Sequence, residues 1–365
     1  MKNLIAVVTV LMAIAMGTLA EQPTVPTQLT LSLSPSSPEK GLLPANTDGQ
    51  TVAVITITAN HEVTISHLPM YIGQLGDGHL KLERVAVYNG ATLIGQTLDT
   101  PMDQEIQVQL TPPLVVTGST TLTIKVNTGT VAENESGQGF FVQVPSYKTV
   151  TTEKEVSVSS EPLNSAHFYV MRSVPTVLLN EQLEHGVESS GLSKEPLNDE
   201  KLYVFGVAAS SSADIGIGKL TFTIKTQNVE LTNPKLDLGS DDFLPLTMAN
   251  KESGTYVAEF KEPWMVPGGT IKYIGLNANL RPINDEASVT VQLLGDETFG
   301  VGAIPTQYKN TASKRFVWTD FSATPLLEAA DKTVWTAEQW FGGMLVPTID
   351  GSKLPRESMA VAFSR

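Results

Sequence analysis

One phrase of eight residues occurs twice in the chain, 150 positions apart, and it constrains the fold more than any other feature. PLVVTGST occupies residues 113–120, and PWMVPGGT occupies residues 263–270. Flanking segments match at nearly the same offset: TVAVITITA (51–59) with KLYVFGVAA (201–209), and VTISHLPMYI (63–72) with IGIGKLTFTI (215–224). Because the order and spacing of apolar positions persist, we interpret the chain as a unit of about 150 residues that occurs twice.

The repeated segments alternate apolar and polar residues with a period of two, which is typical of half-buried β-strands. Val, Ile and Thr dominate these segments, and turn signals such as Asn89-Gly90 punctuate them at short intervals. Several short strands of this kind predict an all-β fold with an antiparallel sandwich in each unit. Because FYVMRS (168–173) runs into VPT (174–176) without a Gly/Ser linker, we expect a semi-rigid rod with its boundary there.

The repeated phrase itself predicts a turn between two strands. We expect Pro113 and Pro263 at strand starts, where no ladder donor is needed. Val116 and Val266 are expected to point into the core. Gly118 and its counterpart Gly268-Gly269 would then permit a turn with positive φ before the next strand begins.

The N-terminus predicts export from the cell. Met1-Lys2 is followed by an apolar run from Leu4 to Met16 and by small residues up to Ala20. This run is too short to span a bilayer, and the small residues fit a cleavage site. We therefore expect residues 1–20 to be a signal peptide, with the mature chain beginning near Glu21.

Composition excludes several functions. The chain has no cysteine, so disulfides and thiolate chemistry are excluded. No second apolar run approaches the ~18 residues of a membrane helix, so we expect no membrane span after signal cleavage. The net charge of −14 argues against a nucleic-acid partner, because phosphates would be repelled.

The ends of the two units resemble a known kind of protein. RSVPT (172–176) and FVWTDFSA (316–323), followed by Asp331, Trp340, Gly343 and LVP (345–347), are similar to motifs in predicted cell-surface proteins of uncultured small-genome bacteria. The resemblance implies an all-β chain of tandem immunoglobulin-like antiparallel β-sandwich domains. The repeat places two of them, at 21–173 and 174–322, followed by a short C-terminal extension at 323–365. It also implies a surface or filament-like role, and it carries over no catalytic residue.

The extension, residues 323–365, has no counterpart in the first unit. It contains Trp335, Trp340 and the apolar pieces GMLVPTI and MAVAF, which should not be exposed to water. We expect the extension to pack on the second domain. The alternative is that one piece adds to the sheet edge of a neighbouring subunit, which would give self-association. Trp335 and Trp340 are our candidates for partner binding, whereas Trp264 and Trp318 are expected in the core.

Candidate metal ligands are few. HEVTISH (61–67) lacks the i, i+4 histidine pair of a zinc protease, so we expect no zinc site there. Asp237, Asp241 and Asp242 in LDLGSDDF are weak calcium candidates, because their spacing does not match the twelve-residue calcium loop. A solvated turn is the simpler interpretation, and no other cofactor is expected.

These observations predict a secreted, non-catalytic protein of the cell surface that acts as a structural or adhesive spacer, or as a filament component. The alternative is a carbohydrate-binding protein of the cell surface, and a third hypothesis is an unrecognised hydrolase. The partner, a protein or a cell-envelope glycan, is not identified by the sequence. Exposed aromatic side chains at a groove would favour the carbohydrate hypothesis.

Overall fold

The computed structural model describes residues 28–39, 41–75, 80–131, 136–146, 148–150, 155–158, 161–179, 196–240, 242–283, 287–295, 315–322, 341–342 and 361–362. The predicted signal peptide lies outside these ranges. The described residues form strands joined by turns and loops, without a helix among them, so the predicted all-β sandwich fold is confirmed. A helix long and apolar enough to cross a membrane is likewise not found in this part of the chain.

The first unit consists of strands β1–β11, which form one 11-stranded hydrogen-bonded sheet. Their bounds are β1 (Gln28–Leu33), β2 (Gly41–Pro44), β3 (Thr47–Leu75), β4 (Leu82–Asn89), β5 (Thr92–Thr100), β6 (Gln104–Thr128), β7 (Gln138–Val144), β8 (Lys148–Val150), β9 (Glu155–Val158), β10 (Leu163–Asn164) and β11 (Phe168–Met171). The long strands β3 and β6 pair along most of their length. The N-terminal part of β3 pairs with β1, and its C-terminal part pairs with β7, so these strands run through both layers of the sandwich.

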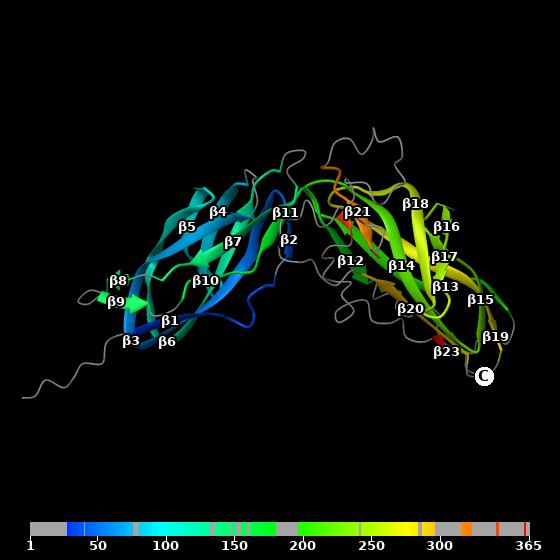
Figure 1. The fold of residues 1–365 in the computed structure, drawn as a ribbon, viewed down its shortest axis with the longest axis horizontal. Coiled ribbons are helices and arrows are strands. Elements are labelled where there is room, and N and C mark those ends of the chain that lie inside the picture. Colours follow the sequence, from blue (N-terminus) through cyan, green and yellow to red (C-terminus); the bar gives the residue numbers. More distant parts are fainter. Residues whose placement is uncertain are drawn as a thin grey trace, which may run out of the picture.

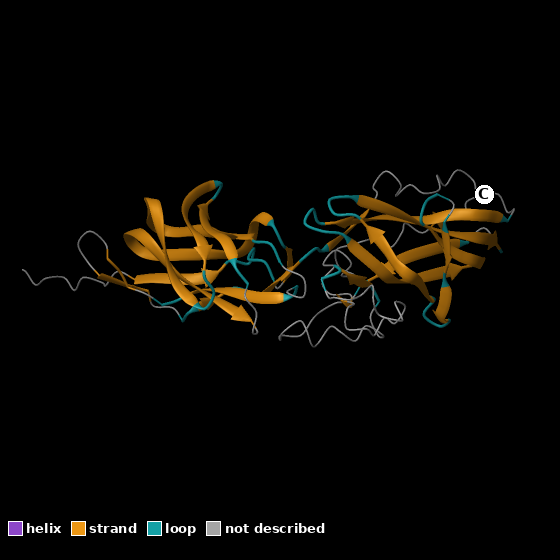
Figure 2. Ribbon diagram, turned by 90° about the horizontal axis from the view of Figure 1, so that it is seen from above, coloured by secondary structure: helices purple, strands orange, loops and turns teal. Residues whose placement is uncertain are grey.

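The second unit consists of the remaining strands, which divide into two sheets. Their bounds are β12 (Pro175–Leu179), β13 (Leu197–Ala209), β14 (Ile215–Gln227), β15 (Val229–Asp237), β16 (Phe243–Pro245), β17 (Thr247–Asn250), β18 (Thr255–Val266), β19 (Ile271–Pro282), β20 (Ser288–Leu294), β21 (Val317–Thr319), β22 (Phe341–Gly342) and β23 (Val361–Ala362). One sheet has the order β12-β13-β19-β15-β16, and the other contains β17-β18-β14-β20-β23 together with β21 and β22. Figures 1 and 2 show the units as two lobes that follow one another along the long axis.

The two units pair their central strands in the same register. In the first unit, Ile65 pairs with Leu114 and His67 pairs with Gln109. In the second unit, the residues at the same places in the repeat pair identically: Ile217 with Trp264, and Lys219 with Glu259. Both ladders therefore contain a bulge at the same place, formed by residues 110–113 in β6 and 260–263 in β18.

The bulge corrects the prediction for the two prolines. Pro113 lies inside β6 and Pro263 lies inside β18, so neither begins a strand. A bulge leaves residues out of the ladder, so a proline without an N–H is tolerated there. The repeated phrase is a strand, a turn and a strand only in the second unit, because β6 continues through Gly118, whose φ is +81°.

Each unit has its own apolar core, which follows from the alternating pattern. In β20, every second residue is buried, namely Val289, Val291 and Leu293. Val116 and Val266 are also fully buried, as predicted from the repeated phrase. Trp318, on β21, is buried in the core of the second unit, as predicted for that residue.

Candidate functional site

The junction between the units is the first region of functional interest. Residues 172–174 connect β11 of the first unit to β12 of the second. The hydroxyl group of buried Ser173 donates to the carbonyl of Ala213 at 2.6 Å, and the backbone N–H of Val174 donates to the hydroxyl of Ser210 at 3.1 Å. The hydroxyl of Ser212 donates to the carbonyl of Arg172 at 2.7 Å. The connecting backbone is therefore held along its length by the loop after β13.

Asp320 joins the junction from the far end of the second unit. It follows β21 and is fully buried. Its carboxylate accepts hydrogen bonds from the backbone N–H of Arg172 at 3.0 Å and from the hydroxyl of Ser136 in the first unit. The hydroxyl and the N–H of Ser322 donate to its other oxygen at 2.6 and 3.1 Å. Because a buried carboxylate must be satisfied by such donors, these contacts fix the two units together.

Apolar side chains of the first unit also contact the core of the second. Tyr169 and Met171, both on β11, belong to the buried cluster of the second unit, and Leu42 and Leu75 pack against that cluster. The neighbouring Phe168 and Val170 belong instead to the cluster of the first unit. Strand β11 therefore contributes alternate residues to two cores, which the period of two in a strand makes possible.

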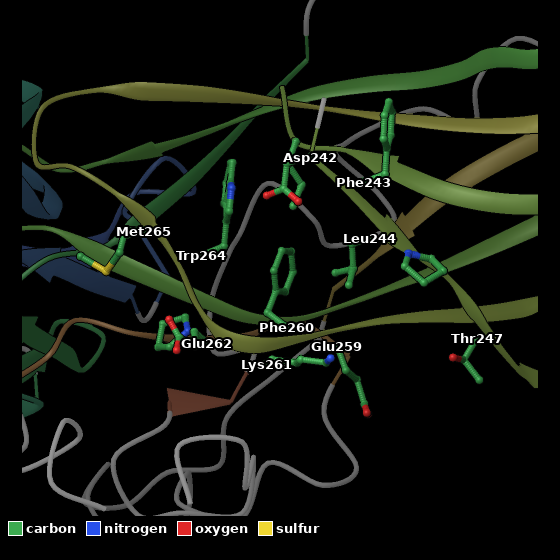
Figure 3. A pocket seen from close by; sticks show the side chains of 13 residues that line it. Asp242, Phe243, Leu244, Thr247, Glu259, Phe260, Lys261, Glu262, Trp264 and Met265 are labelled. Atoms are coloured by element: carbon green, nitrogen blue, oxygen red, sulfur yellow. The ribbon is translucent and has the colours of Figure 1, made fainter. Parts of the chain in front are cut away.

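A groove of about 1070 Å³ lies at one edge of the second sandwich, between β16 and β18 (Figure 3). Three aromatic residues line it: Phe243, Phe260 and Trp264. The Phe260 and Trp264 rings stack with centroids 6.3 Å apart. Figure 3 shows both rings and the Asp242 carboxylate directed toward the same hollow.

The first unit closes the edge at which this groove opens. There, Gly95 of β5 pairs with Leu110 of β6. A Cβ atom at Gly95 would lie 2.7 Å from the carbonyl oxygen of Gln109, so only glycine allows this close approach. In the second unit, Leu244 takes the place of Gly95, because it pairs with Leu236 in the way that Gly95 pairs with Val87. Phe260 takes the place of Leu110, because it directly follows Glu259, which corresponds to Gln109. These two larger side chains line the groove, and no pairing joins β16 to β18 among the described residues.

The charged lining of the groove is mainly acidic, and two lysine ammonium groups lie over its aromatic rings. The charged lining residues are Asp242, Glu259, Glu262 and Lys261. The Lys235 ammonium lies 3.9 Å from the centre of the Phe243 ring, and the Lys272 ammonium lies 5.2 Å from the centre of the Trp264 ring. Lys235 also pairs with Asp199 at 3.0 Å, and this contact lowers the pKa of the Asp199 carboxyl below its usual value.

Two of the three predicted calcium ligands, Asp237 and Asp242, lie in the described part of the chain. One oxygen of Asp237 accepts the backbone N–H of Gly239 at 3.0 Å, and the other lies 3.8 Å from the Lys201 ammonium. Asp242 lines the groove, whereas Asp241 lies outside the described residues. Within the described ranges, no group of three His, Cys, Asp or Glu residues could hold a metal ion.

Two further predictions concern tryptophans. The partner-binding candidates Trp335 and Trp340 lie outside the described residues. Trp264 was expected in the core; it is half-buried, packs against the core cluster of the second unit and also lines the groove. The signal that could have identified it is in the repeat itself: leucines at 110 and 114 become aromatic residues at 260 and 264.

Comparison with known proteins adds little to these observations. No protein-family model and no curated protein matches the chain. The chain has a likeness to a solved structure of the serine-rich repeat protein Srr2 from Streptococcus agalactiae, with 10% sequence identity over 74% of this chain and 88% of that one, and a TM-score of 0.14. A TM-score this low carries no argument about function.

Proposed function

We propose that the protein is a secreted, non-catalytic surface protein in which two sandwich units form a stiff structural and adhesive spacer, or one component of a filament. The observation that carries this proposal is the junction. Its backbone is hydrogen-bonded at Arg172 and Val174, its carboxylate Asp320 is buried, and side chains of β11 enter both cores.

Stiffness follows from the chemistry of these contacts. A flexible linker between domains is exposed and polar, and few contacts cross it. Here Ser173 and Asp320 are fully buried, so bending at residues 172–174 would expose groups whose hydrogen bonds are made only in the extended arrangement. A spacer benefits from this rigidity because it holds whatever it presents at a fixed distance from its attachment.

Small-angle X-ray scattering of the mature chain tests the proposal. We expect one elongated conformation for the parent chain and a broader distribution of dimensions for a double variant, Ser173→Ala with Asp320→Ala. The matched control is Ser34→Ala with Asp48→Ala, which changes the same residue types away from the junction. A parent chain as variable as the double variant would contradict the proposal.

Limited proteolysis gives a second, independent measurement of the same property. Backbone that is hydrogen-bonded and buried resists cleavage, because a protease needs an extended, accessible segment. We expect residues 172–174 to survive in the parent chain and to be cut early in the double variant. Cell fractionation tests the location of the protein. Sequencing of the mature N-terminus tests signal cleavage, and we expect the mature chain to begin near Glu21.

A further inference from the structure

We propose that the groove between β16 and β18 binds a neutral glycan. This inference goes beyond the spacer role, since it concerns the outer edge of the second unit and not the junction. It concerns residues Asp242, Phe243, Glu259, Phe260 and Trp264, which line one continuous hollow. Its basis is a comparison of the two units, followed by the exclusion of other ligand classes.

The second unit replaces aliphatic side chains by aromatic ones at this edge. Leu110 and Leu114 of the first unit correspond to Phe260 and Trp264. Leu93, which pairs with Tyr88, corresponds to Phe243, which pairs with Asp237. All three aromatic replacements line the groove, although the same sandwich is built with leucines in the first unit. Phe260 is buried in the core of the second unit and Trp264 packs against that core, whereas the ring of Phe243 is 41% exposed and can contact a ligand.

Charge excludes ionic ligands. An anionic ligand would meet Asp242, Glu259 and Glu262 on a chain whose net charge is −14. A cationic ligand would be attracted to the carboxylates and to the aromatic faces. However, the ammonium groups of Lys235 and Lys272 already lie over the Phe243 and Trp264 rings, and would repel another cation.

The edge strand excludes an added peptide strand. Addition of a strand requires a row of free N–H and C=O groups on the edge. Strand β16 is only three residues long, and one of them, Pro245, has no N–H. Strand β16 therefore offers too few donors, and the outer edge of β18 is interrupted here by the bulge at residues 260–263 and by Pro263, which has no N–H.

A neutral sugar is the ligand class that the charge and the strand edge do not exclude. A pyranose ring has an apolar C–H face, which lies well on an aromatic ring, and a rim of hydroxyl groups that can donate to carboxylates. Phe243 is 41% exposed, and the Lys235 ammonium lies 3.9 Å from the centre of its ring. Asp242 directs its carboxylate, an acceptor, into the hollow, and Glu259, Lys261 and Glu262 belong to the lining (Figure 3). The groove volume of about 1070 Å³ exceeds that of a single sugar, so we expect an oligosaccharide to bind.

Calorimetric titration of the full mature chain tests this inference. The neutral probes are cellohexaose, maltoheptaose, xylohexaose and chitohexaose, and the charged probes are a heparin-derived hexasaccharide and heptalysine. We expect saturable binding of at least one neutral probe. Phe243→Ala and Asp242→Asn should each weaken that binding roughly tenfold or more. The matched control is Leu93→Ala, which removes an exposed side chain at the corresponding place in the first unit.

The possible outcomes separate clearly. No binding of any neutral probe at about 1 mM, where weak sugar binding would still be detected, overturns the inference. So does binding that Phe243→Ala and Asp242→Asn leave intact, or that Leu93→Ala weakens equally. Binding of only a charged probe overturns it in favour of an ionic ligand. The scattering test of the junction is unaffected by these variants, so the spacer proposal can fail or survive separately.

Discussion

The carboxylate of Asp320 accepts a hydrogen bond from the backbone N–H of Arg172 at 3.0 Å, which ties the end of the second unit's strand β21 to the residue where the first unit ends. The guanidinium group of Arg172 in turn donates a hydrogen bond to the carbonyl of Phe321 at 3.3 Å. The two closing strands, β11 and β21, thus meet at one point although they are nearly 150 residues apart. These two hydrogen bonds connect the end of the first unit to the end of the second in both directions.

Replacing Asp320 by alanine should destabilise the protein by about 2–4 kcal/mol, because Ser136, Arg172 and Ser322 would each lose a buried acceptor. Asp320→Asn keeps one acceptor oxygen and should cost less. Urea unfolding measures both changes. Equal losses in the two variants would show that the side-chain oxygens do not carry the effect.

Replacing Met171 by alanine should weaken the second unit, although Met171 lies on the last strand of the first. Its side chain belongs to the buried cluster of the second unit, so its loss should cost about 2–4 kcal/mol there. The control is the adjacent Val170→Ala, whose side chain belongs to the first cluster. Hydrogen exchange should show reduced protection of β14 and β20 in Met171→Ala. In Val170→Ala, it should show reduced protection of β3 and β7. The reverse pattern would contradict the shared-strand arrangement.

Replacing Gly95 by alanine should destabilise the first unit by about 1–3 kcal/mol, since the new Cβ atom would lie 2.7 Å from the Gln109 carbonyl and 2.9 Å from Leu110. Gly41→Ala is the matched control, because its Cβ would meet Phe168 at an ordinary 3.7 Å. Thermal unfolding compares the two. If Gly95→Ala is as mild as Gly41→Ala, the close approach does not explain why the first unit has no groove at this edge.

Much of the fold could be predicted from the sequence because it depends on local pattern. The period of two predicted the strands and their buried faces, as at Val116 and Val266. The repeat also anticipated which segments would align, and the register of Ile65–Leu114 with Ile217–Trp264 agrees with it. Placement of the two prolines was wrong, because a bulge is a property of two paired strands and cannot be seen in one.

The groove could not be predicted because it depends on a failure of pairing. Whether an edge closes is decided by the fit of Gly95 against Leu110, or of Leu244 against Phe260, and these residues are distant in sequence. The substitution of leucines by aromatic residues was visible in the repeat, but an aromatic side chain in a strand is more often part of a core. Only the unpaired edge between β16 and β18 distinguishes an aromatic residue that lines a groove from one that only fills a core.

Replacing Lys235 by methionine should raise the pKa of Asp199 toward its ordinary value of 3.8, because the hydrogen bond from Lys235 is the main cause of its lowering. A lowered carboxyl pKa contributes stability above the unfolded pKa, and that contribution is lost as the pH falls through the folded pKa. The parent chain should therefore lose slightly more stability than the variant below pH 3.8. The difference will be small because the pair is exposed. Carboxyl NMR titration measures the pKa directly, and an unchanged value would assign the lowering to Asn277 and Lys201.

The last prediction concerns the extension, residues 323–365. Its described parts are strands β22 and β23, which pair with β21 and β20 of the second unit, Trp318 with Phe341 and Val289 with Val361. Deleting the extension should therefore lower the melting temperature of the second unit in the monomer, because two ladders lose their partner strands. The competing hypothesis is that the same strands complete the sheets of a neighbouring copy. It predicts that the deleted chain keeps its melting temperature but no longer assembles, which sedimentation would reveal. If deletion changes neither stability nor assembly, both interpretations of the extension are wrong.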